Sequence, residues 1–132
     1  LAEGIETLND FFINYYGKHV DKARKRFCRS LAAYSLICYF LQIKDRHNAN
    51  ILLHKDGHIA HIDFGFFFTK APGGKLEVDV PFKLVSEYVE VLGGQHSGLF
   101  QELENYSTSS SSFFCLMQKG DSWPLVNTKI AF

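Results

Sequence analysis

The chain has 132 residues, of which 46% are hydrophobic and 15% aromatic, and its formal net charge is zero. This length fits at most one small domain with its own core, and the neutral charge gives no support for a nucleic-acid-binding protein. The three cysteines have no metal-binding spacing, and their odd number favours reduced thiols in an intracellular protein.

Two helices are predicted in the first third of the chain. Apolar residues recur at helical spacing over residues 5–16, and Gly17 is the expected stop. Residues 21–41 predict a longer helix that is apolar on nearly all sides beyond residue 30, which indicates a buried central helix. A basic cluster opens this helix and has two interpretations: a patch for lipid head groups, or a solvated helix face, which is favoured because such runs commonly solvate helices. The cluster consists of Lys22, Arg24, Lys25, Arg26 and Arg29.

Most groups that could act together in catalysis lie in residues 44–65. Asn50 lies five positions after Asp45, and an Asp-Phe-Gly triplet follows at 63–65. This arrangement is typical of phosphoryl transfer, in which the protein supplies positioning and charge rather than covalent chemistry. Asn50 and Asp63 offer the oxygen ligands that Mg²⁺ prefers, and Asp45 or His47 could accept the proton of the attacking hydroxyl.

A hairpin is predicted to bring these groups together. Residues 51–53 form a short apolar run, and residues 58–63 form the return strand. Asp56-Gly57 predicts a two-residue type I′ turn, which requires φ > 0 at both positions. A hairpin of this length places Asn50 near Asp63, so that one divalent ion could touch both side chains.

Histidines in the same segment raise the question of a zinc site. His54, His58 and His61 lie close in sequence to Asp63, but their spacing matches no zinc signature. Strand alternation also places His58 and His61 on opposite faces. We therefore expect His61 to support the catalytic residues rather than to bind zinc.

The order of residues in the catalytic loop indicates a family. Protein kinases have His-Arg-Asp, whereas this chain has Asp45-Arg46-His47. That inverted order, with Asn50 and the His-Ile-Asp-Phe-Gly run at 61–65, resembles the phosphatidylinositol 3- and 4-kinases. The resemblance runs from about residue 7 to residue 94. The flanking segments are most similar to the type III phosphatidylinositol 4-kinases, the beta form in particular. These segments are residues 30–36, Lys44, residues 71–74 and residues 81–84.

The resemblance implies an α+β fold, namely a mainly helical part of the larger, C-terminal lobe of a protein-kinase-like catalytic domain with a catalytic-loop β-hairpin. Residues 1–94 would then be a partial lipid kinase catalytic domain containing helices, the catalytic loop and the activation loop. No Gly-rich loop or strand-borne lysine precedes the catalytic loop, so the smaller, ATP-holding lobe is expected to be missing. The chain alone is accordingly expected to be inactive.

The resemblance also implies roles for the site residues. Asp45 would orient or deprotonate the inositol hydroxyl, with His47 as a competing base. Arg46 would position the loop or neutralise phosphate charge. ATP would be the co-substrate and Mg²⁺ the cofactor. The cofactor-binding set is Asn50, Asp63, Phe64 and Gly65, of which Asn50 and Asp63 would hold Mg²⁺.

The remainder of the chain divides into a loop, a helix and a tail. By family analogy, residues 66–80 form the activation loop that meets the inositol head group, and their few charges favour plain phosphatidylinositol. Residues 81–92 predict an element start followed by a helix, which the glycines at 93–94 end. From residue 95 the resemblance fades and a serine-rich tract follows, so residues 95–132 are predicted to be a divergent, disordered tail.

The expected function is phosphoryl transfer from ATP to the inositol 4-hydroxyl of phosphatidylinositol, giving phosphatidylinositol 4-phosphate. One alternative is a phosphatidylinositol 3-kinase or a related protein kinase with the same inverted loop, and another is a non-catalytic truncated isoform acting as a binding module. No secretory signal or membrane-spanning stretch is seen. The resemblance implies a cytoplasmic protein peripheral on intracellular membranes, the Golgi in particular, with no nucleic-acid partner.

Overall fold

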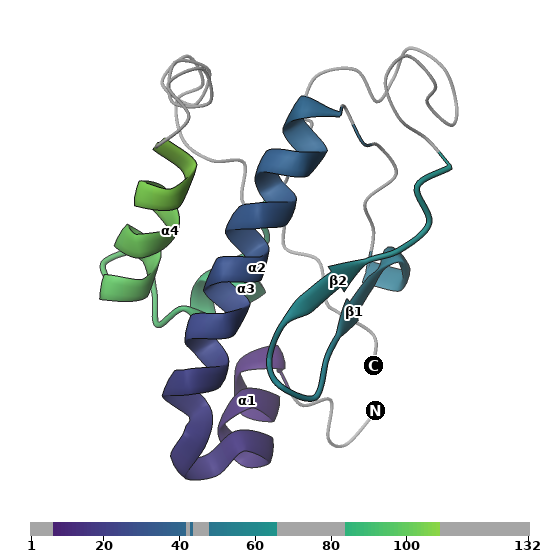
Figure 1. Ribbon diagram of the computed structural model, residues 1–132. Coiled ribbons are helices and arrows are strands. Elements are labelled where there is room, and N and C mark those ends of the chain that lie inside the picture. The colour runs from purple at the N-terminus through teal and green to yellow at the C-terminus, as the bar shows by residue number, and fades with distance from the viewer. Residues whose placement is uncertain (1–6, 42, 44–47, 66–83, 109–132) are drawn as a thin grey trace.

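The computed structural model describes residues 7–41, 43, 48–65 and 84–108. The long helix α2 runs through the middle, with a two-stranded hairpin on one side and α4 on the other (Figure 1). The described part is mainly helical with one small sheet, in agreement with the predicted α+β class. None of its helices is both long and apolar enough to cross a membrane. In chain order the elements are α1 (Leu8–Tyr16), η1 (Gly17–His19), α2 (Val20–Phe40), η2 (Asn48–Asn50), β1 (Ile51–Leu53), β2 (Ile59–His61), α3 (Ser86–Val91) and α4 (Gly98–Thr108).

Helix α1 has a strong start signal and a glycine stop. The Thr7 side chain accepts a hydrogen bond from the amide of Asp10 at 3.1 Å, while the Asp10 carboxylate accepts from the Thr7 amide at 3.3 Å. This reciprocal capping box satisfies backbone donors that the first helical turn leaves without partners. The helix ends at Gly17, where φ is +48°. The predicted helix and its predicted stop are confirmed, although the helix begins at Leu8, after the Thr7 cap, and not at residue 5.

Helix α2 provides the centre of the core. Phe27 is fully buried and meets the ring of Phe12 from α1 and the ring of Tyr88 from α3, both edge-on with ring centroids 5.4 Å apart. Edge-to-face contacts of this kind add to the stabilisation from burying the rings themselves. The aromatic stack therefore ties three helices together.

The prediction of a helix buried on nearly all sides is only partly right for α2. Leu31 and Cys38 are fully buried, as expected. Ile37, Phe40 and Leu41 instead remain 41–55% exposed. An apolar composition alone does not show which neighbours cover each side of a helix. The C-terminal end of α2 thus presents an apolar surface.

The apolar stripe predicted at 84–92 is confirmed, although the helix itself is shorter. Its members all face the core: Leu84, Val85, Tyr88, Val89 and Leu92 are buried. Leu84 and Val85 precede the helix, which spans Ser86–Val91. Gly93 and Gly94 follow with φ of +91° and +96°, values that favour glycine.

The predicted disordered tail from residue 95 is wrong for Gly98–Thr108, which form α4. The hydroxyl of Ser97 accepts from the amide of Phe100 at 3.1 Å and so caps the start of this helix. Phe100 and Leu103 are buried in the same core as α2. Ser107, the first residue of the serine-rich tract, belongs to this helix and not to a disordered tail. Its side chain is buried and donates to the Leu103 carbonyl of the same helix at 2.9 Å. Residues 109–132 lie outside the described residues.

The contact between α2 and α4 predicts an unreactive thiol at Cys28. This fully buried side chain donates to the Leu99 carbonyl at 3.3 Å, and burial raises the pKa of the Cys28 thiol to about 11. At pH 8 we expect Cys28 to react with iodoacetamide about 100-fold more slowly than N-acetylcysteine, because the thiolate is the reactive form. Its rate should rise with pH until about pH 11. Peptide mapping by mass spectrometry would measure the rate, and ordinary reactivity would contradict the packing of α4 on α2.

Candidate active site

The predicted hairpin is present, but its turn differs from the one expected. Strands β1 and β2 pair antiparallel, with Ile51 opposite His61 and Leu53 opposite Ile59. The Gly57 amide donates to the His54 carbonyl at 2.8 Å, so Lys55 and Asp56 are the central turn residues. Gly57 has φ of +95°, whereas Asp56 is not among the described residues with positive φ. The predicted type I′ turn at Asp56-Gly57 is therefore wrong. The loop has three residues and ends in a glycine bulge, a common alternative for hairpins.

The hairpin is fixed to the helices by three hydrogen bonds from side chains. Ser30 on α2 accepts from the amide of Ile59 at 3.0 Å. Near the tip of the hairpin, the Tyr16 hydroxyl donates to the carbonyl of His54 at 3.2 Å, and Arg26 donates to the carbonyl of Asp56 at 3.3 Å. These bonds hold a sheet of only two strands, which would be marginal alone, in one position on α2.

Removing the hydroxyl of Ser30 should loosen the hairpin measurably. Ser30→Ala removes the hydroxyl that accepts from the Ile59 amide. Because Ile59 is buried, we expect the unpaired amide to cost about 1–3 kcal/mol in the free energy of unfolding. Ser35→Ala is the matched control, because the buried Ser35 hydroxyl donates only within α2, to the Ala32 carbonyl. Urea unfolding followed by circular dichroism would compare them. Equal losses would show that Ser30 does not anchor the strand.

His61 is held by two side chains of α2 that the sequence analysis did not assign to the site. Its ring stacks on Tyr34 with centroids 4.4 Å apart, and its Nδ1 lies 3.6 Å from the Sγ of Cys38. Tyr34 and Cys38 are four residues apart and so share a helix face, which is the signal that could have paired them. These contacts fix the strand two residues before Asp63, and the supporting role of His61 in catalysis stays a prediction.

The open end of the hairpin brings the predicted magnesium ligands to one place along the backbone. The Asn50 carbonyl accepts from the Ile62 amide at 2.9 Å, and Ile62 directly precedes Asp63. Asn50 is buried, whereas Asp63 is exposed. Asp63 has φ of +58° and is the single non-glycine residue with positive φ in the described ranges. Such backbone conformations are uncommon outside glycine and concentrate at functional sites, so this value makes Asp63 a candidate functional residue.

The residues after Asp63 are exposed as well. The Asp63 carboxylate accepts a hydrogen bond from the Gly65 amide at 3.3 Å. Phe64 is 45% exposed. Asp45, Arg46 and His47, together with the predicted activation loop at 66–80, lie outside the described residues, so their predicted roles stay predictions.

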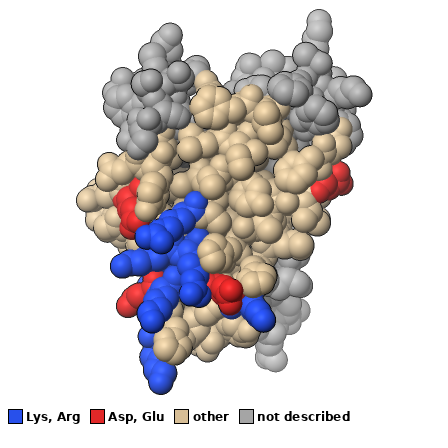
Figure 2. All heavy atoms as spheres, viewed as in Figure 1, with Lys and Arg blue, Asp and Glu red and all other residues tan. Residues whose placement is uncertain are grey.

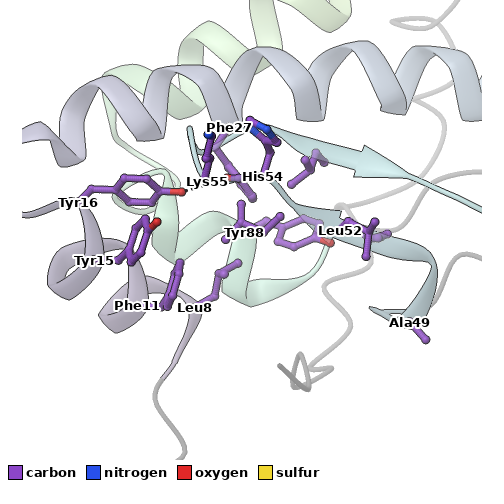
Figure 3. Close-up of a pocket in the computed structure, with 13 residues that line it drawn as sticks. Leu8, Phe11, Tyr15, Tyr16, Phe27, Ala49, Leu52, His54, Lys55 and Tyr88 are labelled. Atoms are coloured by element: carbon purple, nitrogen blue, oxygen red, sulfur yellow. Dashed lines mark hydrogen bonds between the residues drawn. The ribbon is translucent and has the colours of Figure 1, made fainter.

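An apolar pocket of about 510 Å³ lies between α1 and the hairpin (Figure 3). Phe11 and Tyr15 line it from α1, Leu52 from β1 and Tyr88 from α3. Neither Asn50 nor Asp63 contributes to its lining. We therefore place the predicted magnesium ligands at the open end of the hairpin, outside this pocket.

The basic cluster lies at the other end of the hairpin. Lys and Arg side chains gather over the N-terminal half of α2 (Figure 2). Arg24 donates to Asn9 at 2.9 Å, and Arg26 holds the hairpin tip, so two members have structural partners. Lys22, Lys25 and Arg29 are exposed. This arrangement fits the solvated helix face better than a head-group patch, because the tip is the end of the hairpin remote from Asn50 and Asp63.

Comparison with known proteins identifies the family. The family model described as phosphatidylinositol 3- and 4-kinase matches residues 5–114. Phosphatidylinositol 4-kinase PIK1a of Candida albicans is 48% identical over 93% of this chain and 14% of its own length. Phosphatidylinositol 4-kinase beta 1 of Arabidopsis thaliana is 45% identical over 77% of this chain and 9% of its own length. A putative human phosphatidylinositol 4-kinase alpha-like protein is 51% identical over 65% of this chain and 15% of its own length.

These values leave the beta and alpha subtypes undistinguished, because relatives of both names match at similar identity. The chain also spans only a small part of each relative's length. The match nevertheless covers the helices, the hairpin and the candidate site together. The chain belongs to the phosphatidylinositol 3- and 4-kinase family.

Proposed function

We propose that these residues carry the catalytic loop of a phosphatidylinositol 4-kinase, which transfers a phosphoryl group from ATP to the inositol 4-hydroxyl. The observation that supports this most directly is the open end of the hairpin, where the Asn50 carbonyl meets the Ile62 amide beside Asp63. Two of the relatives compared above are named phosphatidylinositol 4-kinases, and the third is named a putative phosphatidylinositol 4-kinase alpha-like protein.

The donor set suits magnesium. Mg²⁺ takes oxygen ligands and usually keeps several waters, so an amide oxygen and one carboxylate with bound phosphates suffice. Asn50 and Asp63 would supply these two protein oxygens. When bound, the ion would neutralise charge on the transferred phosphoryl group.

An apolar face beside the proposed ligands suits the base of ATP. Leu52 is 51% exposed and Ile62 40% exposed, and strand alternation puts them on the same face of the hairpin. A flat purine would cover such a surface favourably. Phe64 and Gly65 follow Asp63, and we assign them a part in binding the nucleotide.

The proton of the inositol hydroxyl needs an acceptor and the phosphates need positive charge. We assign the first role to Asp45, with His47 as the competing base, and the second to Arg46. A general base of this kind contributes about 10²–10⁴-fold to the rate.

The substrate we propose is phosphatidylinositol without further phosphates, at the surface of an intracellular membrane such as the Golgi. Residues 66–80 carry few charges, and the two positive charges of Lys70 and Lys75 are balanced by Glu77 and Asp79. A polyphosphorylated head group would call for more basic groups than this segment offers.

A lipid kinase assay tests the proposal. The full-length gene product is incubated with Mg-ATP and vesicles containing phosphatidylinositol, and the product is deacylated and separated by chromatography. We expect the 4-phosphate. Formation of the 3-phosphate would assign the protein to the phosphatidylinositol 3-kinases. Failure to bind Mg-ATP or make any product would favour a non-catalytic binding module instead.

A further inference from the structure

The tip of the hairpin gathers three side chains that commonly bind metal ions. The His54 amide donates to the His58 carbonyl at 2.7 Å, so the two histidines face each other across the turn with Asp56 between them. Residues directly opposite on paired strands project to the same face. One ligand atom from each of His54, Asp56 and His58 lies within 4.8 Å of the others, and all three residues are exposed. We propose that the hairpin tip binds a transition-metal ion, Zn²⁺ in particular, through these three side chains.

The donor types select the class of metal. Two imidazoles and a carboxylate are typical ligands of Zn²⁺, with a water completing the tetrahedron. Mg²⁺ and Ca²⁺ prefer oxygen ligands and fit this set poorly. Zinc–ligand bonds of 2.0–2.2 Å place two tetrahedral ligands about 3.4 Å apart. The His54 Nδ1 and the Asp56 carboxylate are 3.5 Å apart, close to that spacing.

The backbone that presents these ligands is held in place. The carbonyl of His54 is fixed by Tyr16 and that of Asp56 by Arg26. The buried Gly57 packs directly on Ala23 of α2. Because the backbone is already fixed, metal binding has to order only the three side chains and not the loop that carries them.

Two features set the expected strength of binding. The amide of Asp56 donates to the His54 Nδ1 at 3.3 Å, so ligation through this nitrogen replaces a hydrogen bond. Lys55 and Arg26 add positive charge at the tip, which opposes a cation. We therefore expect micromolar rather than tight structural binding. The site differs from the zinc set considered from the sequence, because His61 is buried against Tyr34 away from the exposed tip.

Titration of the purified chain with ZnCl₂ in a calorimeter tests this inference, with CoCl₂ as a spectroscopic probe. We expect one ion per chain, and His54→Gln and His58→Gln should each raise the dissociation constant tenfold or more. Asp56→Asn is the third tip variant and should also raise the dissociation constant, and asparagine keeps a side chain suited to turns. His96→Gln is the matched control, since His96 is an exposed histidine outside this cluster.

The possible results separate clearly. A control variant that binds like the parent chain, with weakened tip variants that retain the parent circular dichroism, supports the site. Equal affinity of all variants, or no saturable binding, overturns it. A sulfur-to-cobalt charge-transfer band would assign the ion to cysteines and would also overturn it.

Discussion

Asp63→Asn is expected to lower phosphatidylinositol phosphorylation by the full-length gene product about 10³-fold, because it removes the only carboxylate assigned to the magnesium ion. Asparagine keeps one oxygen but loses the negative charge, so Mg²⁺ should bind more weakly and neutralise the phosphoryl group less well. Initial rates at several Mg²⁺ concentrations would measure the loss, and raising Mg²⁺ should recover part of it.

Asparagine is chosen because the backbone at this position is unusual. Asp63 has φ of +58°, a conformation that asparagine also tolerates, whereas alanine would add strain and confuse the comparison. Glu104→Gln, which removes one charge from the exposed side of α4, is the control and should leave the rate unchanged. If Asp63→Asn retains more than a tenth of the parent rate, Asp63 is not the principal magnesium ligand.

Local signals were sufficient to predict the first three α-helices. The caps and apolar spacing of α1, the length of α2 and the buried stripe around α3 all follow from residues near one another in sequence. Helix α4 was missed although Ser97 and the apolar residues after it carry a similar signal. The serine-rich tract that follows outweighed that signal, because composition cannot show that Ser107 lies in a packed helix.

The hairpin at the candidate site was predictable from the sequence, but the contacts that hold it on α2 were not. The predicted pairing of residues 51–53 with the return strand at 58–63 correctly placed the backbone of Asn50 beside Ile62, directly before Asp63. The stacking of Tyr34 on His61 joins residues 27 positions apart in the chain, and the Ser30–Ile59 hydrogen bond joins residues 29 apart. Such pairs depend on how the hairpin docks on α2, and no local pattern specifies that docking.

The turn of the hairpin also shows that local sequence patterns do not specify how the hairpin docks on α2. Asp-Gly between two apolar runs predicts a type I′ turn when the strands decide the geometry alone. Here the tip also packs on α2, with Gly57 against Ala23 and Arg26 bonded to the Asp56 carbonyl. We infer that this docking favours the three-residue loop with its bulge, in which only the glycine needs a positive φ.

Gly57→Ala is therefore expected to be among the most destabilising single changes in the chain, with a loss of about 3 kcal/mol in the free energy of unfolding. A Cβ at this position would lie 2.8 Å from the carbonyl oxygen of Ala23 and 2.9 Å from its Cα. Both atoms belong to the backbone of α2 and cannot move aside cheaply. The φ of +95° adds strain for any residue with a side chain.

Gly94→Ala separates the two causes, because Gly94 has nearly the same φ, +96°, but a Cβ there would have no atom within 4 Å. We expect this control to lose only the strain contribution, about 1–2 kcal/mol. Urea unfolding of both variants by circular dichroism would give the difference, which measures the contact between the hairpin tip and α2. Equal losses would mean that the tip does not pack on Ala23, and the placement of Asn50 and Asp63 by a fixed hairpin would lose its physical basis.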